Sequence, residues 1–253
     1  MTHPFFSGTR HPRVLAHRGL VPDGDTSLWE NTAGAFAAAQ AAGAEYIETD
    51  CQLSSDGDVV LFHDDSIERL TGDPRLVSSM RTRELEGLFA DHGGLLTVAD
   101  ALDAFPESRF NIDVKTAAAV DPIGRLLAPH THRVLVTSFS DRTRLAALDS
   151  IRRAGAPTPP ATSGGSRTIL ALRALSAMRL SPARVLRDID AVQIPERHAG
   201  IRILTPHLLR AAHAHGVEVH VWTVNEPDVM RRLIDSGVDG VVTDRADLAL
   251  KAI

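Results

Sequence analysis

Acidic side chains alternate along one stretch of the chain in a pattern that predicts a cation site. Residues 45–64 read EYIETDCQLSSDGDVVLFHD, which predicts two strands joined by a turn at 54–58. Because alternate side chains of a strand share a face, Glu48 and Asp50 point to one side and Thr49 to the other. Two carboxylates on one face of a buried strand are costly unless a proton or a cation satisfies them. A hard divalent cation with oxygen ligands is the simplest solution.

A third acidic side chain follows on the next predicted core strand. Residues 109–115 read RFNIDVK and place Asn111, Asp113 and Lys115 on one face. Carboxylates from neighbouring strands suit Mg²⁺ or Ca²⁺ and leave positions for water and substrate oxygens. The predicted metal ligands are therefore Glu48, Asp50 and Asp113. The alternative interpretation is that one or more of these acids are ordinary ion-pair partners of Arg18 or Lys115.

Two histidines occur at the ends of apolar stretches, where the acids also lie. His17 ends the apolar stretch that starts at Arg13, and His63 directly follows residues 59–62. Histidine takes up or gives a proton near neutral pH. A pair beside a cation fits displacement at phosphorus, with one histidine activating the nucleophile and the other protonating the leaving oxygen. A single histidine at a strand end is more often structural. Arg18 directly follows His17 and weakens that interpretation, because arginine is suited to bidentate binding of phosphate oxygens.

Four further side chains each allow two interpretations or carry no chemistry. Lys115 either neutralises phosphate charge in the transition state or is a structural partner of a nearby acid. Trp222 either lines the mouth of the site and stacks on substrate or packs in the core. Asn225 either caps the following helix or touches substrate. Cys51 lies on the opposite face of the strand from Glu48 and Asp50, so we expect it to be buried and unreactive.

The candidate residues lie along a regular alternation of strands and helices. We expect strands at 13–17, 45–53, 109–115, 133–139, 160–163, 190–195, 218–225 and 238–244. We expect helices at 30–43, 97–105, 121–128, 140–153, 167–180, 205–215 and 227–236, and a last helix at the C-terminus. Prolines 157, 159 and 160 keep the fifth strand short. This alternation predicts an α/β fold, a (β/α)8 TIM barrel with functional side chains at the C-terminal ends of its strands; an open doubly wound sheet is the alternative.

Residues 65–95 interrupt the alternation. Turn signals occur at 71–74 and 91–94, and only one short helix is expected between them, at 81–89. Long segments with little core of their own are usually functional or flexible. We therefore expect a small insertion after the second strand, over one mouth of a single catalytic barrel domain that spans 1–253.

Composition and charge narrow the class of protein. The 253 residues are 43% hydrophobic and 23% charged, which is ordinary for a soluble globular chain. A net charge of −5 provides no basic surface for nucleic acid, and one cysteine excludes an internal disulfide. No stretch reaches the roughly 20 apolar residues of a membrane span, and the first residues have no signal-peptide core. We expect a cytoplasmic enzyme or binding domain without an integral membrane segment; nothing in the sequence specifies the oligomeric state.

Taken together, the motifs resemble those of the glycerophosphodiester phosphodiesterase family. The resemblance covers nearly the whole chain and keeps the order of the motifs: His17-Arg18-Gly19, Glu30-Asn31-Thr32, Glu48-Thr49-Asp50, His63-Asp64, Asp113-Val114-Lys115 and Trp222-Thr223-Val224-Asn225. It implies a TIM barrel of the phosphatidylinositol-phospholipase-C-like kind, with an insertion after the second strand.

The resemblance also implies roles and a reaction. His17 and His63 resemble the family's catalytic acid/base pair, and Arg18 resembles its phosphate-binding arginine. Lys115 resembles its active-site lysine, and the acids at 48, 50 and 113 resemble its metal ligands. The implied reaction is hydrolysis of a glycerophosphodiester to glycerol 3-phosphate and an alcohol, with Mg²⁺ or Ca²⁺. The family more often has Glu where this chain has Asp113, which is one methylene shorter.

Two other readings of the site stay open at this point. One keeps the phosphodiesterase reaction but changes the substrate to a lysophospholipid or another phosphodiester. The absence of an amphipathic anchor or an exposed aromatic cluster disfavours a membrane substrate. The other is a non-catalytic barrel that binds a phosphate ligand. A pure binding protein needs no acid/base pair, so the presence of both His17 and His63 argues against that reading.

Overall fold

Eight parallel strands form a barrel in the computed structural model, which describes residues 3–253. Neighbouring strands follow the order β6-β5-β4-β2-β1-β11-β10-β7. Their bounds are β1 Arg13–His17, β2 Tyr46–Leu53, β4 Arg109–Val114, β5 Val134–Thr137, β6 Ala161–Thr162, β7 Ala191–Ile194, β10 Glu218–Val221 and β11 Gly240–Thr243. The predicted TIM barrel is confirmed, including a fifth barrel strand that is only two residues long.

The barrel closes at its shortest strand. β6 meets β7 through a single parallel bridge between Ser163 and Ala191, and the Asp190 amide donates to the Thr162 carbonyl at 2.9 Å. The Asp190 carboxylate in turn accepts from the Thr162 amide. A closed ring excludes the open doubly wound sheet and brings the C-terminal ends of all eight strands around one mouth.

The register of the strands decides which side chains face the barrel interior. His17 pairs with Glu48, Glu48 with Asn111, and Asp50 with Asp113 across β1, β2 and β4. Alternate residues of these strands, such as Ile47 and Phe110, face outward and are fully buried under the helices. The polar residues therefore occupy the inner face near the strand ends, as their spacing predicts.

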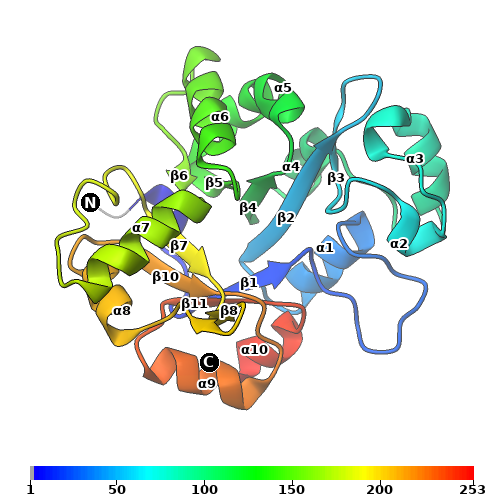
Figure 1. Cartoon of the computed structure of the whole chain (residues 1–253). Coiled ribbons are helices and arrows are strands. Elements are labelled where there is room, and N and C mark those ends of the chain that lie inside the picture. Colours follow the sequence, from blue (N-terminus) through cyan, green and yellow to red (C-terminus); the bar gives the residue numbers. More distant parts are fainter. Residues whose placement is uncertain (1–2) are drawn as a thin grey trace.

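Helices surround the strands as an outer ring (Figure 1). Their bounds are α1 Ala33–Ala41, α4 Val98–Ala104, α5 Val120–Leu127, α6 Asp141–Arg153, α7 Ser166–Ala177, α8 Pro206–His213, α9 Pro227–Asp235 and α10 Ala246–Ala252. Short 3-10 turns occupy Pro4–Phe6, Val77–Ser79, Ala117–Ala119 and Ala128–Arg133. Thr32 caps α1 by accepting from the Ala35 amide, and Thr97 caps α4 with Asp100 as its reciprocal partner.

The segment 65–95 has its own small core. It follows β3 (Val59–Leu61), which pairs antiparallel with β2, and it contains α2 (Glu68–Thr71) and α3 (Thr82–Phe89) beside β3 (Figure 1). Five of its buried apolar side chains form one cluster with Val60 and Phe62, which precede the segment: Ile67, Val77, Met80, Leu85 and Phe89. The segment is thus better packed than the expectation of little core, because apolar residues from three short helical turns converge on β3.

A second local feature was not predicted. The strands β8 (Arg197–His198) and β9 (Ile201–Arg202) form an exposed hairpin between β7 and α8. Each strand has only two residues, which is too short for a pattern of alternation to reveal it. Among residues 3–253, no helix has both the length and the apolar character needed to cross a membrane.

Candidate active site

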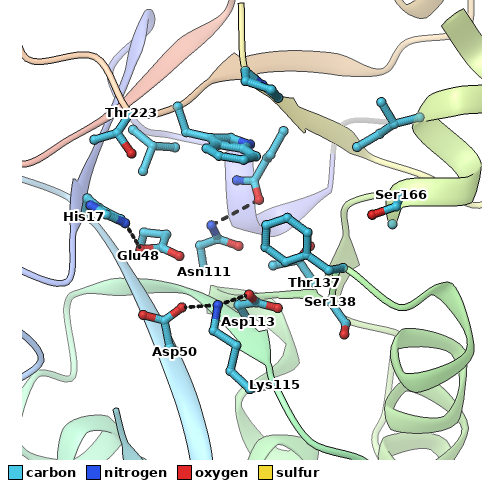
Figure 2. A pocket seen from close by; sticks show the side chains of 18 of the residues that line it. His17, Glu48, Asp50, Asn111, Asp113, Lys115, Thr137, Ser138, Ser166 and Thr223 are labelled. Atoms are coloured by element: carbon cyan, nitrogen blue, oxygen red, sulfur yellow. Dashed lines mark hydrogen bonds and ion pairs between the residues drawn. The ribbon is translucent and has the colours of Figure 1, made fainter. Parts of the chain in front are cut away.

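A cavity of about 410 Å³ opens at the C-terminal ends of the barrel strands. The structure brings all the predicted site residues to its wall: His17, Arg18, Glu48, Asp50, His63, Asp113, Lys115 and Trp222. They come from different strands and meet because those strands end at the same face of the barrel. Figure 2 shows most of the polar ones around one space.

Lys115 lies between two of the acids (Figure 2). Its Nζ is 2.8 Å from Asp50 Oδ1 and 2.5 Å from Asp113 Oδ2. Arg18 Nε lies 3.2 Å from the other oxygen of Asp50. Asp50 and Asp113 are thus ion-pair partners of Lys115 and Arg18 in this structure, as the alternative interpretation of the sequence expects.

Two carboxylate oxygens in the cavity wall remain without a hydrogen-bond donor, although one of them lies 3.9 Å from His17 Nε2. Glu48 Oε2 and Asp113 Oδ1 are buried and accept no hydrogen bond. No group of three His, Cys, Asp or Glu side chains in residues 3–253 is arranged to hold a metal ion. Lys115 contacts one oxygen of Asp50 and one of Asp113. A buried carboxylate oxygen without a donor is costly, however, and a hard cation is a suitable partner for it. Because these two carboxylate oxygens lack a hydrogen-bond donor, the residues of the site are suitable ligands for a divalent cation.

The acids differ in their affinity for a proton. Burial, together with the nearby charge of Asp50, raises the pKa of Glu48 to about 8. Burial also raises the pKa of Asp113 above its usual value, although Lys115 partly opposes it. Burial acts in the same direction on Asp50, but the charges of Lys115 and Arg18 outweigh it and the pKa of Asp50 is lowered. Asp50 is thus the acid held firmly in its charged form.

His17 is held by an aspartate from the far end of the chain. Its Nδ1 lies 2.6 Å from Asp244 Oδ1, and its Nε2 lies 3.9 Å from Glu48 Oε2. Burial lowers the pKa of His17, but the hydrogen bond to Asp244 and the charge of Glu48 outweigh it, so the pKa is raised. Asn225 donates to the other oxygen of Asp244 at 2.8 Å, and the expectation that it caps the following helix is wrong. Glu226 is the residue that precedes α9.

His63 has a similar partner. Its Nδ1 lies 2.6 Å from Asp64 Oδ1, and Asp64 Oδ2 accepts from Arg69 Nε at 2.6 Å. Arg69 belongs to α2 of the 65–95 segment and also binds Glu30 Oε1 at 2.5 Å. The same oxygen of Glu30 accepts from Arg18 Nη1 at 2.8 Å. A chain of charge-assisted hydrogen bonds therefore connects His63 to Arg18.

A sharp turn directs Arg18 into this network. Arg18 has a φ of +59° and Gly19 a φ of +90°. A Cβ at position 19 would lie 2.8 Å from the backbone of Ala35, so only glycine allows the turn to pass against α1. The turn is tied down at both ends, because the Arg18 amide donates to the Glu48 carbonyl and the Asn31 amide donates to the Arg18 carbonyl.

One side of the cavity is apolar. Phe139 and Leu170 line it and are 61% and 63% exposed, which is unusual for large apolar side chains. Trp222 meets Phe139 edge to face, with ring centroids 5.8 Å apart. The Lys115 Nζ lies 5.4 Å from the centre of the Phe139 ring. We refer to Phe139, Leu170 and Trp222 below as the apolar wall.

Sequence reasoning missed the residues that hold the histidines and the arginine. Asp64 and Glu30 occur within the quoted motifs, but their contacts with His63 and Arg18 were not expected. Asp244 is separated from His17 by 227 positions, and nothing local marks it. Its place at the end of the eighth barrel strand was the only available signal. Cys51 is fully buried on the outer side of β2, as its parity predicts.

Comparison with known proteins gives one consistent result. A family profile described as "Glycerophosphoryl diester phosphodiesterase family" matches residues 17–248. A Mycobacterium tuberculosis protein named probable glycerophosphodiester phosphodiesterase 2 is 39% identical over 238 residues, which cover 93% of this chain and 88% of that protein. The crystal structure of a Thermotoga maritima glycerophosphodiester phosphodiesterase is 25% identical with a TM-score of 0.70, covering 96% of this chain and 99% of the other. An Oleispira antarctica phosphodiesterase, solved with the product sn-glycerol-3-phosphate, shares the fold at 22% identity, a TM-score of 0.74 and 96% coverage of both chains.

Proposed function

The chain belongs to the glycerophosphoryl diester phosphodiesterase family and is a phosphoric diester hydrolase, and we propose that it cleaves glycerophosphodiesters with His17 and His63 as acid and base. The observation that carries this proposal is the pair of aspartate-bound histidines in one cavity wall. In each, Nδ1 is bound to an aspartate at 2.6 Å, so Nε2 is the nitrogen available to a substrate.

The two histidines supply the proton transfers. One accepts the proton of the attacking oxygen, which belongs to water or to a hydroxyl of the substrate itself. The other donates a proton to the oxygen of the leaving alcohol as its bond to phosphorus breaks. If water attacks, the products are glycerol 3-phosphate and a free alcohol. If a hydroxyl of the substrate attacks, the alcohol leaves first and a cyclic phosphate forms, which water then opens to glycerol 3-phosphate. Asp244 and Asp64 keep the rings oriented and stabilise whichever ring carries the extra proton.

Arg18 and Lys115 would hold the phosphate. Arg18 Nη1 donates to Glu30, and Nε is in ion-pair contact with Asp50, so Nη2 would be the donor to a phosphate oxygen. Lys115 is a point charge at the cavity wall that neutralises the charge growing on phosphorus-bound oxygens. The carboxylates around both cations set their position before substrate arrives.

Glu48, Asp50 and Asp113 would hold Mg²⁺ or Ca²⁺, with the orphaned oxygens of Glu48 and Asp113 as the first ligands. When bound, a divalent cation supplies Lewis-acid charge to the phosphate oxygens. Asp113 is shorter than glutamate, and its bond to Lys115 holds only one of its two oxygens.

The first test measures glycerol 3-phosphate released from glycerophosphocholine and glycerophosphoethanolamine, with Mg²⁺, with Ca²⁺ and with a chelator. We expect release that requires the cation and stops with the chelator. Binding of glycerophosphocholine by folded protein without any release would instead favour the non-catalytic binding barrel.

A second test addresses the histidines. We expect His17→Ala and His63→Ala each to fold and to lose on the order of 10²-fold or more in kcat, because a positioned acid or base contributes about 10²–10⁴-fold. Arg152→Ala, which removes an exposed arginine of α6 far from the cavity, is the control. Near-normal rates in both histidine variants would remove the acid/base assignment.

The apolar wall favours one alternative substrate class. A lysophospholipid carries a hydrocarbon chain that would cover the exposed rings and side chains of Phe139 and Leu170. Equal turnover of glycerophosphocholine and lysophosphatidylcholine would support this second candidate. If the chain-bearing substrate is not cleaved, the small glycerophosphodiesters remain the proposed substrates.

A further inference from the structure

A file of buried polar side chains runs through the barrel interior to the cavity. His220 of β10 is fully buried; its Nε2 lies 3.0 Å from Glu218 Oε2 and its Nδ1 lies 3.5 Å from Gln193 Nε2. Gln193 Oε1 in turn accepts from Asn111 Nδ2 at 3.2 Å. Asn111 and Gln193 both line the cavity. We call these four residues the polar file, and the hydrolysis described above uses none of them.

The polar file has a direction. The Glu218 carboxylate only accepts hydrogen bonds, and it also pairs with Arg13 at 2.9 Å. The His220 Nε2 therefore donates, and in the neutral ring Nδ1 is then an acceptor. Gln193 must turn its NH₂ group to His220 and its oxygen toward Asn111. Asn111 satisfies that oxygen with its own NH₂ group, which leaves its carbonyl oxygen for the cavity.

That oxygen lacks a partner. Asn111 is only 1% exposed, and its Oδ1 makes no hydrogen bond. Figure 2 shows Asn111 in the middle of the site, and it pairs in register with Glu48 on β2. An unsatisfied buried acceptor is unfavourable, so a ligand that donates a hydrogen bond gains affinity there. Phosphate oxygens at neutral pH are mainly acceptors, whereas a hydroxyl group can donate.

We propose that Asn111 Oδ1 accepts a hydrogen bond from a hydroxyl of the glycerol part of the substrate, and that Asn111 is thereby a specificity-determining residue. Glu218, His220 and Gln193 are positioning residues that fix which end of the amide faces the cavity. The inference rests on the proposed function, because it requires a substrate with a polyol part.

The test compares two ligands with the same phosphate. Calorimetric titrations with Mg²⁺ present would measure the binding of sn-glycerol 3-phosphate and of propyl phosphate, which lacks both hydroxyls. We expect the wild type to prefer glycerol 3-phosphate by about tenfold, as one hydrogen bond to a buried acceptor allows. Asn111→Leu should remove the preference by weakening glycerol 3-phosphate alone.

Ser163→Ala is the matched control. Ser163 Oγ is another buried oxygen without a hydrogen-bond partner, but Ser163 is not among the described residues that line the cavity. The preference should therefore be unchanged in this variant. A similar loss in Ser163→Ala would show that any buried polar deletion in the barrel has this effect and would overturn the assignment to Asn111.

His220→Phe tests the positioning role. A phenyl ring keeps the edge contact with Phe6, whose ring centre is 6.0 Å away, but gives Gln193 nothing to donate to. We expect a partial loss of preference, with no further loss when it is combined with Asn111→Leu. If the two variants lose preference additively, His220 and Asn111 act independently and the positioning role of His220 is refuted. If Asn111→Leu does not fold, an unchanged preference in His220→Phe overturns the positioning role.

Two other results would also overturn the proposal. One is that Asn111→Leu weakens the binding of both ligands equally. The other is that it lowers the affinity for Mg²⁺ when no phosphate is present, which would assign Asn111 to the metal. Turnover of glycerophosphocholine by the wild type separates the proposed hydrolysis from the proposed role of Asn111. Turnover without a preference for glycerol 3-phosphate refutes this inference alone, and a preference without turnover refutes the proposed hydrolysis alone.

Discussion

At the scale of single residues, the site depends on pairs rather than on isolated side chains. His17 and His63 each direct Nδ1 to an aspartate, and in both pairs the distance is 2.6 Å. Such a partner fixes the tautomer and the ring orientation of a histidine. We therefore expect the aspartates to affect turnover, although neither is proposed to touch substrate.

Asp244→Asn should lower kcat by on the order of 10²-fold, because the amide no longer holds His17 in the required tautomer. Burial lowers the pKa of His17, and Asp244 is the main influence that opposes it. Without this charge the pKa falls, so the limb of the pH–rate profile that reports His17 should move to lower pH. Steady-state kinetics between pH 5 and 9 measure both effects.

The matched control is Asp247→Asn, which makes the same change next to Arg245 on the surface of α10. It should leave kcat and the pH profile close to those of the wild type. An Asp244→Asn enzyme with normal kcat and an unshifted limb would show that Asp244 does not orient His17.

The candidate site residues could be predicted because each one is marked locally. A polar residue with the right parity at the C-terminal end of an apolar strand must face the mouth of a barrel. All the predicted residues accordingly line the cavity. Their partners could not be predicted in the same way, since the contact between His17 and Asp244 exists only once the first and last barrel strands pair.

At the scale of elements, the floor of the barrel is held by an ion pair between strands that are not neighbours. Arg13 of β1 and Glu218 of β10 meet at 2.9 Å, although β11 lies between their strands. Burial favours the neutral form of Glu218, but hydrogen bonds from His220 and Arg13 outweigh it and lower its pKa from 4.5 to about 2. The charged form is therefore strongly preferred in the folded protein.

Glu218→Gln should destabilise the fold by about 3 kcal/mol at pH 7, since a tenfold change in proton affinity corresponds to about 1.4 kcal/mol. A lowered carboxyl pKa contributes stability that is complete above the unfolded value of 4.5 and is lost as the pH falls toward about 2. The difference between wild type and variant should thus shrink between pH 5 and pH 2. Urea unfolding across that range measures it.

Asp149→Asn, on the exposed side of α6, is the control and should change stability by less than about 1 kcal/mol, because surface ion pairs contribute little. A constant difference between wild type and Glu218→Gln at all pH values would mean that the carboxylate charge is not the source of the stability.

Elements with a strong periodicity of apolar residues were predicted well, whereas the shortest elements were not predicted. Long strands such as β2 and β4 alternate clearly, and helices with threonine caps such as α4 begin where expected. The β8–β9 hairpin and the short helix α2 have only two to four residues in each element. Elements this short contain too few residues for alternation or helical periodicity to appear in the sequence.

At the scale of the whole molecule, the barrel is not equally strong around its circumference. β2 pairs with β4 over six residues, whereas β6 and β7 are joined by one bridge. Local opening requires few broken hydrogen bonds at such a seam. The molecule should therefore open first between β6 and β7.

Amide hydrogen exchange tests this expectation. The amides of Thr162, Gly164 and Asp190, whose hydrogen bonds cross this seam, should exchange at least about tenfold faster than those of residues 47–51 at pH 7. The amides of β10 and β11, which pair over only two residues, provide an internal reference of intermediate protection. Equal protection of β6 and β2 would indicate that the barrel opens only by global unfolding.

The contact of Arg69 with Asp64 and Glu30 has a consequence for how this fold can vary. The 65–95 segment has its own core and looks like a detachable module, yet it provides the guanidinium that joins the surroundings of His63 to those of Arg18. A shortened barrel without the segment would retain eight strands and lose the counter-charge at its own reactive centre. The segment is therefore not interchangeable: any loop grafted in its place must deliver a cation to the same two carboxylates.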